Sequence, residues 1–192
     1  NIDRFLLIPY DYDNTFGIDW FSINWDTIDP YTYYLISDNE RPLADIVFNN
    51  ESYRNLFSRY LQFFIDHNFN LSEWGYWIDN TKDMIYTSAY NDTYRTLDYG
   101  FTYNDFINSF SATNYTNQHV KNGLKEFIIN RVSSLENQIT LIDGNPLVYK
   151  YWVEPENPLE GDTIIIHAAA YGYPGIQDIN VITHNLNDGS YQ

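Results

Sequence analysis

Apolar residues recur at steps of three and four along the middle of the chain, and this spacing predicts helices. Between residues 52 and 67 they form one broad stripe, made of Tyr53, Leu56, Phe57, Tyr60, Leu61, Phe64 and Ile65. A stripe of this width is typical of an amphipathic helix that buries one face. We expect the stripe to be a core face, and His67 to complement the helix dipole at the C-terminal end.

A second helix is expected to start at Ser72 as N-cap and to run to about residue 90. A short helix over residues 103–110, capped by Thr102, should follow. The expected buried face of the second helix comprises Trp74, Trp77, Ile78, Thr81, Ile85 and Ala89.

The longest helix is predicted over residues 117–142. Its expected buried face comprises Val120, Leu124, Phe127, Ile128, Val132, Leu135 and Ile139. Arg131 lies at the edge of that face. We expect Arg131 to form an ion pair with a neighbouring helix, in preference to binding a substrate.

Residues 18–39 show no helical period, alternate aromatic with polar side chains and contain Pro30, so a long ordered loop is predicted. The loop is expected to pack on the core as a lid, and the alternative is that its aromatic side chains line a binding groove. The aromatic residues concerned are Trp20, Trp25, Tyr31, Tyr33 and Tyr34.

The period changes from helical to strand-like after the break at residues 143–146. Strands are predicted over 147–153, 163–169 and 176–183, which would begin a β-sandwich without completing it. We therefore expect an α+β chain with two domains, residues 1–143 and residues 144–192.

The first residues carry the candidate chemistry. The apolar run 5–8 predicts a buried strand that ends at Pro9 and delivers Asp11 and Asp13 into a polar turn. Carboxylate oxygens are the ligands that Mg²⁺ prefers, although acidic turns commonly do no more than solvate a loop. The pair alone is therefore a weak indication of a metal site.

Composition narrows the function classes. The net charge of −16 disfavours binding to nucleic acid, because phosphate backbones would be repelled. The chain has no cysteine, which excludes disulfides, and no apolar run long enough to cross a membrane. It starts at Asn1 without Met, inside an expected strand, so we expect a preceding part that includes any targeting segment.

The string from Pro9 to Gly17, Pro-Tyr-Asp-Tyr-Asp-Asn-Thr-Phe-Gly, resembles the signature of the CotH kinase family, with Tyr10 where that family usually has Trp. Two looser phrases add to the resemblance. Asn50, Tyr53 and Arg54 open a helix, with Glu51 where the family often has Pro, and residues 124–132 resemble the family's terminal helix.

The resemblance implies the mainly α-helical C-lobe of an atypical protein-kinase-like fold, with a short N-terminal strand and an acidic metal-binding turn. It implies transfer of the γ-phosphoryl group of ATP to Ser or Thr of a protein substrate, with Asp11 binding the nucleotide-associated Mg²⁺ (or Mn²⁺) and Asp13 supporting it. It also implies a secreted or cell-surface bacterial protein, related to spore coat protein CotH, and an immunoglobulin-like module at residues 144–192.

The catalytic base and the ATP-binding residues are expected upstream of Asn1, so no residue here is assigned to catalysis or to the nucleotide, and we expect the fragment alone to be inactive. The alternative is a non-enzymatic surface or adhesion protein that binds a partner or carbohydrate, with the acidic turn as a structural Ca²⁺ site. A third possibility is a decayed kinase kept as a scaffold, against which the presence of both Asp11 and Asp13 argues.

Overall fold

The computed structural model describes residues 15–35, 40–97, 99–111, 114–140, 146–172 and 175–182. The chain divides into two compact units, residues 1–140 and residues 141–192, and each is described by itself. The strand predicted over residues 1–9 lies outside the described residues. The described part is α+β, mostly helical with one two-stranded antiparallel sheet, which confirms the predicted fold class.

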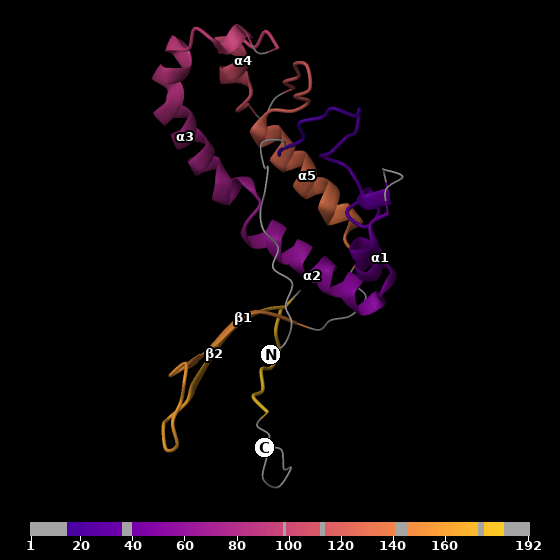
Figure 1. The fold of residues 1–192 in the computed structure, drawn as a ribbon, viewed down its shortest axis with the longest axis vertical. Helices are drawn as coiled ribbons and strands as arrows, with labels where there is room; N and C mark the ends of the chain where they lie inside the picture. The colour runs from indigo at the N-terminus through magenta and orange to yellow at the C-terminus, as the bar shows by residue number, and fades with distance from the viewer. Residues whose placement is uncertain are drawn as a thin grey trace. The chain divides into compact units, whose positions relative to one another are not determined.

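Helices build the first unit (Figure 1). Helix α5 contacts both α2 and α3, while α1 packs on α2 and α4 packs on α3. Short 3₁₀ helices at Tyr33–Leu35 and Arg95–Leu97 interrupt the connections. The α-helices are α1 (Pro42–Asn49), α2 (Glu51–His67), α3 (Leu71–Asn91), α4 (Tyr103–Asn108) and α5 (Leu124–Gln138).

Side-chain caps decide where three of these helices begin. Asn50 accepts a hydrogen bond from the Tyr53 amide at 3.1 Å, and Thr102 caps α4 as predicted. The prediction of Ser72 as N-cap is wrong, because Asn70 accepts from the Glu73 amide at 3.1 Å. Asn70 also donates to the carbonyl oxygen of Ile65 at 3.1 Å. It therefore closes α2 while it starts α3.

The helix predicted over residues 117–142 is wrong over its first turns, because α5 begins only at Leu124. Asn117 and Val120 exchange two backbone hydrogen bonds of 2.9 Å, which form a tight turn in place of a helix. Gly123 ends this turn against Ser111, whose carbonyl oxygen would lie 2.3 Å from a Cβ at position 123. That close approach requires glycine at the N-cap position.

The core forms where α5 meets the α2–α3 corner. The predicted core positions Phe127, Ile128 and Leu135 of α5 are confirmed as buried, and Ile128 is completely inaccessible. Phe127 and Ile128 pack with Phe69 and Ile78 in one cluster. Partly buried apolar residues surround that cluster, namely Phe16, Trp25, Leu71, Phe110 and Val132.

The predicted core face of α2 is largely wrong. Four of its seven residues are exposed, namely Tyr53, Leu56, Tyr60 and Phe64. Ile65 is buried as predicted, and the other buried residues of α2 are the polar Asn55, Ser58 and Arg59. The reason is a polar partner, since the Tyr31 hydroxyl lies 2.6 Å from Ser58 Oγ and draws this side of the helix inward.

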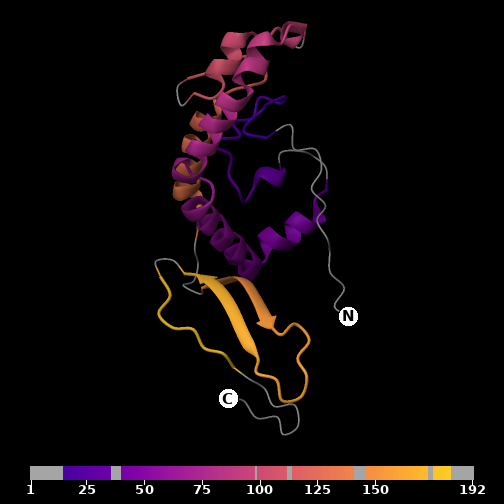
Figure 2. The ribbon, with the colours of Figure 1, turned by 90° about the vertical axis from the view of Figure 1, so that its left-hand side faces the viewer.

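The second unit contains a hairpin of strands β1 (Leu147–Glu154) and β2 (Ile165–Tyr171), drawn as arrows in Figure 2. The strands are antiparallel, with Trp152 opposite His167, and the register is irregular between Val148 and Lys150. The first two of the three predicted strands are present, although β2 starts two residues later than expected.

The third predicted strand, over 176–183, is wrong for the described residues 176–182, which form no strand. The Asp178 carboxylate accepts from the Ile179 amide at 2.8 Å and from the Asn180 side chain at 3.1 Å. Such local hydrogen bonds compete with ladder formation, which fits the absence of a strand in these described residues. The immunoglobulin-like sandwich stays a prediction.

Candidate functional site

The predicted metal residues, Asp11 and Asp13, lie outside the described residues. What the structure describes of the acidic string is its last part, from Thr15 to Gly17. The two carboxylates are hard oxygen donors at positions i and i+2, a donor set that suits Mg²⁺ or Mn²⁺ as well as Ca²⁺. Residues 15–17 then determine how the end of this string is held against the fold.

Phe16 anchors the string in the core. Its ring stacks on Phe69 with centroids 6.2 Å apart, and it meets the rings of Trp74 and Phe127 edge-on at 5.8 and 6.0 Å. Edge-to-face and offset aromatic pairs add stabilisation beyond the burial of their area. The side chain therefore ties the string to α3, to α5 and to the corner between α2 and α3.

Gly17 allows this close packing. Its φ is +80°, a conformation that residues with a Cβ rarely adopt. A Cβ at this position would lie 2.7 Å from Phe127 Cδ2, so the backbone passes directly against the aromatic ring. The Phe-Gly end of the acidic string is thus a structural device that fixes its approach to α5.

The residues after Gly17 are held just as firmly. Ile18 pairs with Val120, and the Asp19 amide donates to the carbonyl oxygen of His119 at 2.7 Å. The Asp19 carboxylate accepts from the amides of Phe21 and Ile23 at 2.9 and 3.0 Å. Burial alone would raise the pKa of Asp19, but these hydrogen bonds and the charge of Lys121 outweigh it and lower that pKa.

A cavity of about 320 Å³ lies beside Gly17. Its most specific feature is Asp26, whose Oδ2 accepts hydrogen bonds of 3.0 Å from the side-chain amides of Asn122 and Asn130. The carboxylate is therefore fixed in place and able to accept a hydrogen bond from a hydroxyl or an ammonium group. The cavity is lined by Gly17, Ile23, Asn24, Trp25, Asp26, Thr27, Lys121 and Asn122.

Sequence reasoning missed Asp26 and its two asparagines. They are far apart in the chain, and lone Asn and Asp residues in a loop normally indicate a turn. No spacing signal joins residue 26 to residues 122 and 130, because the segments meet only in the folded chain.

Arg131 also contacts the loop that contains Asp26. The ion pair with a neighbouring helix that we expected for it is wrong for the described residues, because Arg131 Nη1 donates to the carbonyl oxygen of Ile28 in the loop. Burial lowers the pKa of Arg131, and the charges of Asp26 and Asp29 partly counter that effect. Arg131 also lines an apolar cavity of about 340 Å³ that includes Phe16 and Gly17.

The five aromatic residues of the loop do not share one groove. Tyr31 is buried at 6 % exposure, and its hydroxyl accepts from the Thr140 amide at 3.0 Å. Tyr34 stacks on Phe48 at 5.1 Å, and Trp20 stacks on His119 at 4.0 Å. Trp25 joins the core cluster and Tyr33 is exposed. The lid interpretation therefore fits most of this loop better than the groove.

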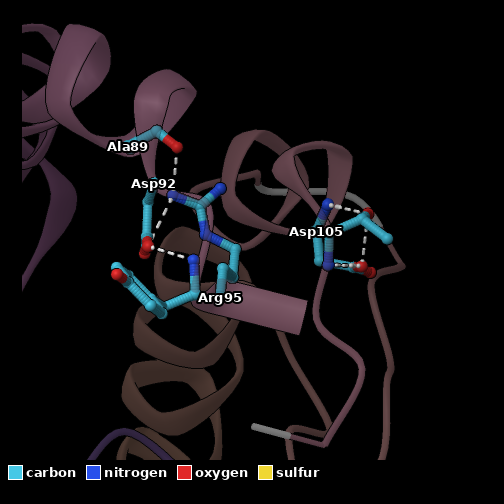
Figure 3. A network of polar contacts seen from close by, with 6 residues as sticks. Ala89, Asp92, Arg95 and Asp105 are labelled. Atoms are coloured by element: carbon cyan, nitrogen blue, oxygen red, sulfur yellow. Dashed lines mark hydrogen bonds and ion pairs between the residues drawn. The ribbon is translucent and has the colours of Figure 1, made fainter. Parts of the chain in front are cut away.

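A second polar network lies at the far end of α3 (Figure 3). Arg95 donates to the carbonyl oxygen of Ala89 and lies 3.9 Å from the Asp92 carboxylate. Asp105 accepts from the backbone and hydroxyl of Thr102 at 2.7 and 2.6 Å, and these bonds lower its pKa. The Asp105 carboxylate also accepts from Asn117 Nδ2 at 2.9 Å, and its contacts are those of a helix cap and its neighbouring loop, so the network is structural.

The described residues offer neither a metal cluster nor a membrane-spanning helix. They contain no group of three or more His, Cys, Asp or Glu side chains that could hold a metal ion. None of their helices is long and apolar enough to cross a membrane. The candidate metal site therefore rests on the acidic string alone.

Most of the chain matches one known protein family. The family described as CotH kinase protein matches residues 1–135, which span the acidic string, the loop and the helices up to most of α5. No curated protein and no solved structure gives a significant match. Because the family match covers well over half of the sequence, the chain belongs to the CotH kinase protein family.

Proposed function

We propose that this chain is part of a metal-dependent atypical protein kinase that transfers the γ-phosphoryl group of ATP to a Ser or Thr hydroxyl of a secreted or surface protein. The observation that carries the proposal is the string Asp11-Tyr12-Asp13-Asn14-Thr15-Phe16-Gly17 inside the region that matches the family. In kinases an aspartate of this kind holds the metal ion on the ATP phosphates.

The surrounding residues support the proposal by the way they hold the string. Phe16 packs among three aromatic rings, and Gly17 lies against Phe127. A ligand carried on a strongly anchored turn keeps its position while substrates enter and leave, and such preorganisation is the main contribution a protein makes to phosphoryl transfer.

Asp11 would bind the metal and Asp13 would ligate or orient it, because both offer carboxylate oxygens. When bound, Mg²⁺ or Mn²⁺ would neutralise charge on the β- and γ-phosphates. Asp26 lines the cavity next to Gly17, where its fixed carboxylate would orient a hydroxyl-bearing substrate by accepting a hydrogen bond.

The test is label transfer from γ-labelled ATP by the full-length protein, with Mg²⁺ or Mn²⁺ and with casein and co-secreted proteins as acceptors. We expect transfer that falls at least about a hundredfold in Asp11→Ala. Glu160→Ala, which removes an exposed carboxylate outside the family match, is the matched control and should keep full activity.

The same variants separate the kinase from the alternative. Calorimetric titration of Ca²⁺ and Mn²⁺ into the folded wild type and Asp11→Ala reports the metal site without any turnover. Metal binding that depends on Asp11, together with no transfer to any acceptor, would favour a surface-binding protein with a structural Ca²⁺ site and reject the kinase.

A further inference from the structure

Helix α3 carries a second periodic stripe on the side opposite its core contact. The stripe advances in steps of three or four residues along almost the whole helix, so its members share one face. We call it the acidic-aromatic face. Its residues are Glu73, Tyr76, Trp77, Asn80, Asp83, Met84, Thr87 and Tyr90.

All eight residues of this face are exposed. Tyr76 is 70 %, Trp77 68 % and Met84 77 % exposed, although Trp77 is predicted from the sequence to lie in the core. The rings of Tyr76 and Trp77 meet edge-on at 5.9 Å, which presents them as one surface. Exposed apolar side chains grouped in this way mark interaction sites more often than scattered ones.

The opposite side of α3 packs against the core. Ile78 is buried there, and α5 packs against that side (Figure 1). At the C-terminal end of the face, Tyr103 of α4 meets the Tyr90 ring edge-on at 5.1 Å. Tyr76, Trp77 and Met84, further along the face, stay largely exposed. The burial of α3 therefore does not explain why this face carries tryptophan, tyrosine and methionine.

The charged residues of the acidic-aromatic face are all acidic. Glu73 and Asp83 lie in the stripe ten residues apart, about 15 Å along the helix axis, and the stripe contains no basic residue. The nearest lysines are committed elsewhere. Lys82 lies over the Phe110 ring at 5.8 Å, and Lys125 pairs with Asp79 at 2.7 Å.

We propose that the acidic-aromatic face of α3 docks a basic amphipathic helix of a partner protein. Apolar residues of that helix would pack on Trp77, Met84 and Tyr76, and its flanking lysines or arginines would approach Glu73 and Asp83. The helical spacing of the face matches a helical ligand, and tryptophan and tyrosine are the residues that most often dominate such interfaces. Two copies of this chain would instead place carboxylates opposite carboxylates.

The probe is a fluorescein-labelled amphipathic peptide with leucines on one stripe and lysines beside them, equal to α3 in its length of 21 residues. A matched peptide carries glutamate in place of each lysine. Anisotropy titrations against the 192-residue chain should show binding of the lysine peptide only. That binding should weaken several-fold when salt is raised from about 0.05 to 0.5 M.

Variants locate the site. Trp77→Ala should weaken binding at least about tenfold, and the double variant Glu73→Gln, Asp83→Asn should weaken it and flatten its salt dependence. Tyr94→Ala is the control, because Tyr94 is 76 % exposed but lies outside the face. Circular dichroism establishes that each variant is folded.

Three results would overturn the proposal. The first is equal binding of the lysine and glutamate peptides, which would indicate unspecific apolar contact. The second is lysine-peptide binding that is absent or that survives Trp77→Ala. The third is a dimer of the chain that Trp77→Ala dissociates, which would identify a second copy as the occupant. None of these measurements depends on kinase activity, so failure here leaves the proposed function untouched.

Discussion

Residues 15–31 and helix α2 form an instructive pair. The segment 15–31 contains no helix or extended strand, yet it holds the buried residues Asp19 and Tyr31. Helix α2 is regular over all its 17 residues, yet Tyr53 and Leu56 on its apolar stripe are exposed. Regular backbone structure and burial are therefore separate properties in this chain.

Side chains of α5 hold the irregular segment in place. Asn130 donates to the Asp26 carboxylate at 3.0 Å, and Gln138 donates to the carbonyl oxygen of Thr27 at 2.9 Å. Arg131 donates to the next carbonyl oxygen, that of Ile28. A loop that lies on a core must satisfy its backbone polar groups, and here one helix supplies the donors.

The first prediction compares a buried position in α5 with an exposed position on the apolar stripe of α2. Ile128→Ala in α5 removes a completely inaccessible side chain and should lower the free energy of unfolding of the first unit by about 2–5 kcal/mol. Leu56→Ala in α2, where the side chain is 45 % exposed, should lower it by less than about 1 kcal/mol. Urea unfolding followed by circular dichroism measures both.

Similar losses in the two variants would break the comparison, because they would mean that the stripe of α2 is covered in solution. The helix propensities of leucine and alanine are close, so the Leu56 variant reports burial and little else.

The second prediction concerns how residues 15–31 enter the core. Gly17→Ala would place a Cβ 2.7 Å from Phe127 Cδ2 at a φ of +80°. Left-handed strain and overpacking together should cost about 2–4 kcal/mol of unfolding free energy. Gly75→Ala in α3 is the matched control, because nothing lies within 4 Å of its Cβ and a helix gains about 0.5–1 kcal/mol from the exchange.

Opposite signs in the two glycine variants would sharpen the comparison, since one chemical change would then stabilise a regular element and destabilise an irregular one. A neutral Gly17→Ala would show that Phe127 moves aside easily, and the Phe-Gly end of the acidic string would lose its structural role.

Periodicity predicted most of the helices but not α1 (Pro42–Asn49), and it predicted their surroundings poorly. It identified α2, α3, α4 and the core residues of α5, because those depend on local spacing. It could not show that Ser58 would be buried by the Tyr31 hydroxyl, 27 residues away in the chain. It also extended α5 through residues 117–123, where the backbone pairing of Asn117 with Val120 and the packing of Gly123 on Ser111 override the apolar spacing.

The candidate site likewise has one part that the sequence reveals and one part that it does not. Asp11 and Asp13 are recognisable because the whole string lies within nine consecutive residues. The cavity beside Gly17 cannot be recognised in the sequence, because Asp26 and Asn122 come from segments that are far apart in the chain.

The third and smallest effect tests a second irregular stretch, residues 114–123. Burial, with the nearby Asp105 carboxylate, raises the pKa of Tyr115 to about 12, and the Tyr115 hydroxyl donates to Asp105 Oδ1 at 3.3 Å. An unfolded tyrosine releases its proton near pH 10, so the unfolded chain binds fewer protons than the folded chain between about pH 10 and 12. The stability that protonated Tyr115 contributes is therefore complete below about pH 10 and lost as pH rises towards 12.

Tyr115→Phe should lower the unfolding free energy by about 0.5–1.5 kcal/mol at pH 8, because a hydrogen bond is lost, and the gap to wild type should narrow as pH rises from 10 to 12. Tyr103, whose pKa burial likewise raises to about 12, is present in both proteins and cancels in the difference. A gap that stays constant would show that the Tyr115 hydroxyl titrates alike in the folded and unfolded chains, and a gap that widens would show that folding lowers its pKa. In either case side-chain hydrogen bonds would not hold residues 114–123 as they hold residues 15–31. The fixed conformation of each irregular segment would then need its own explanation.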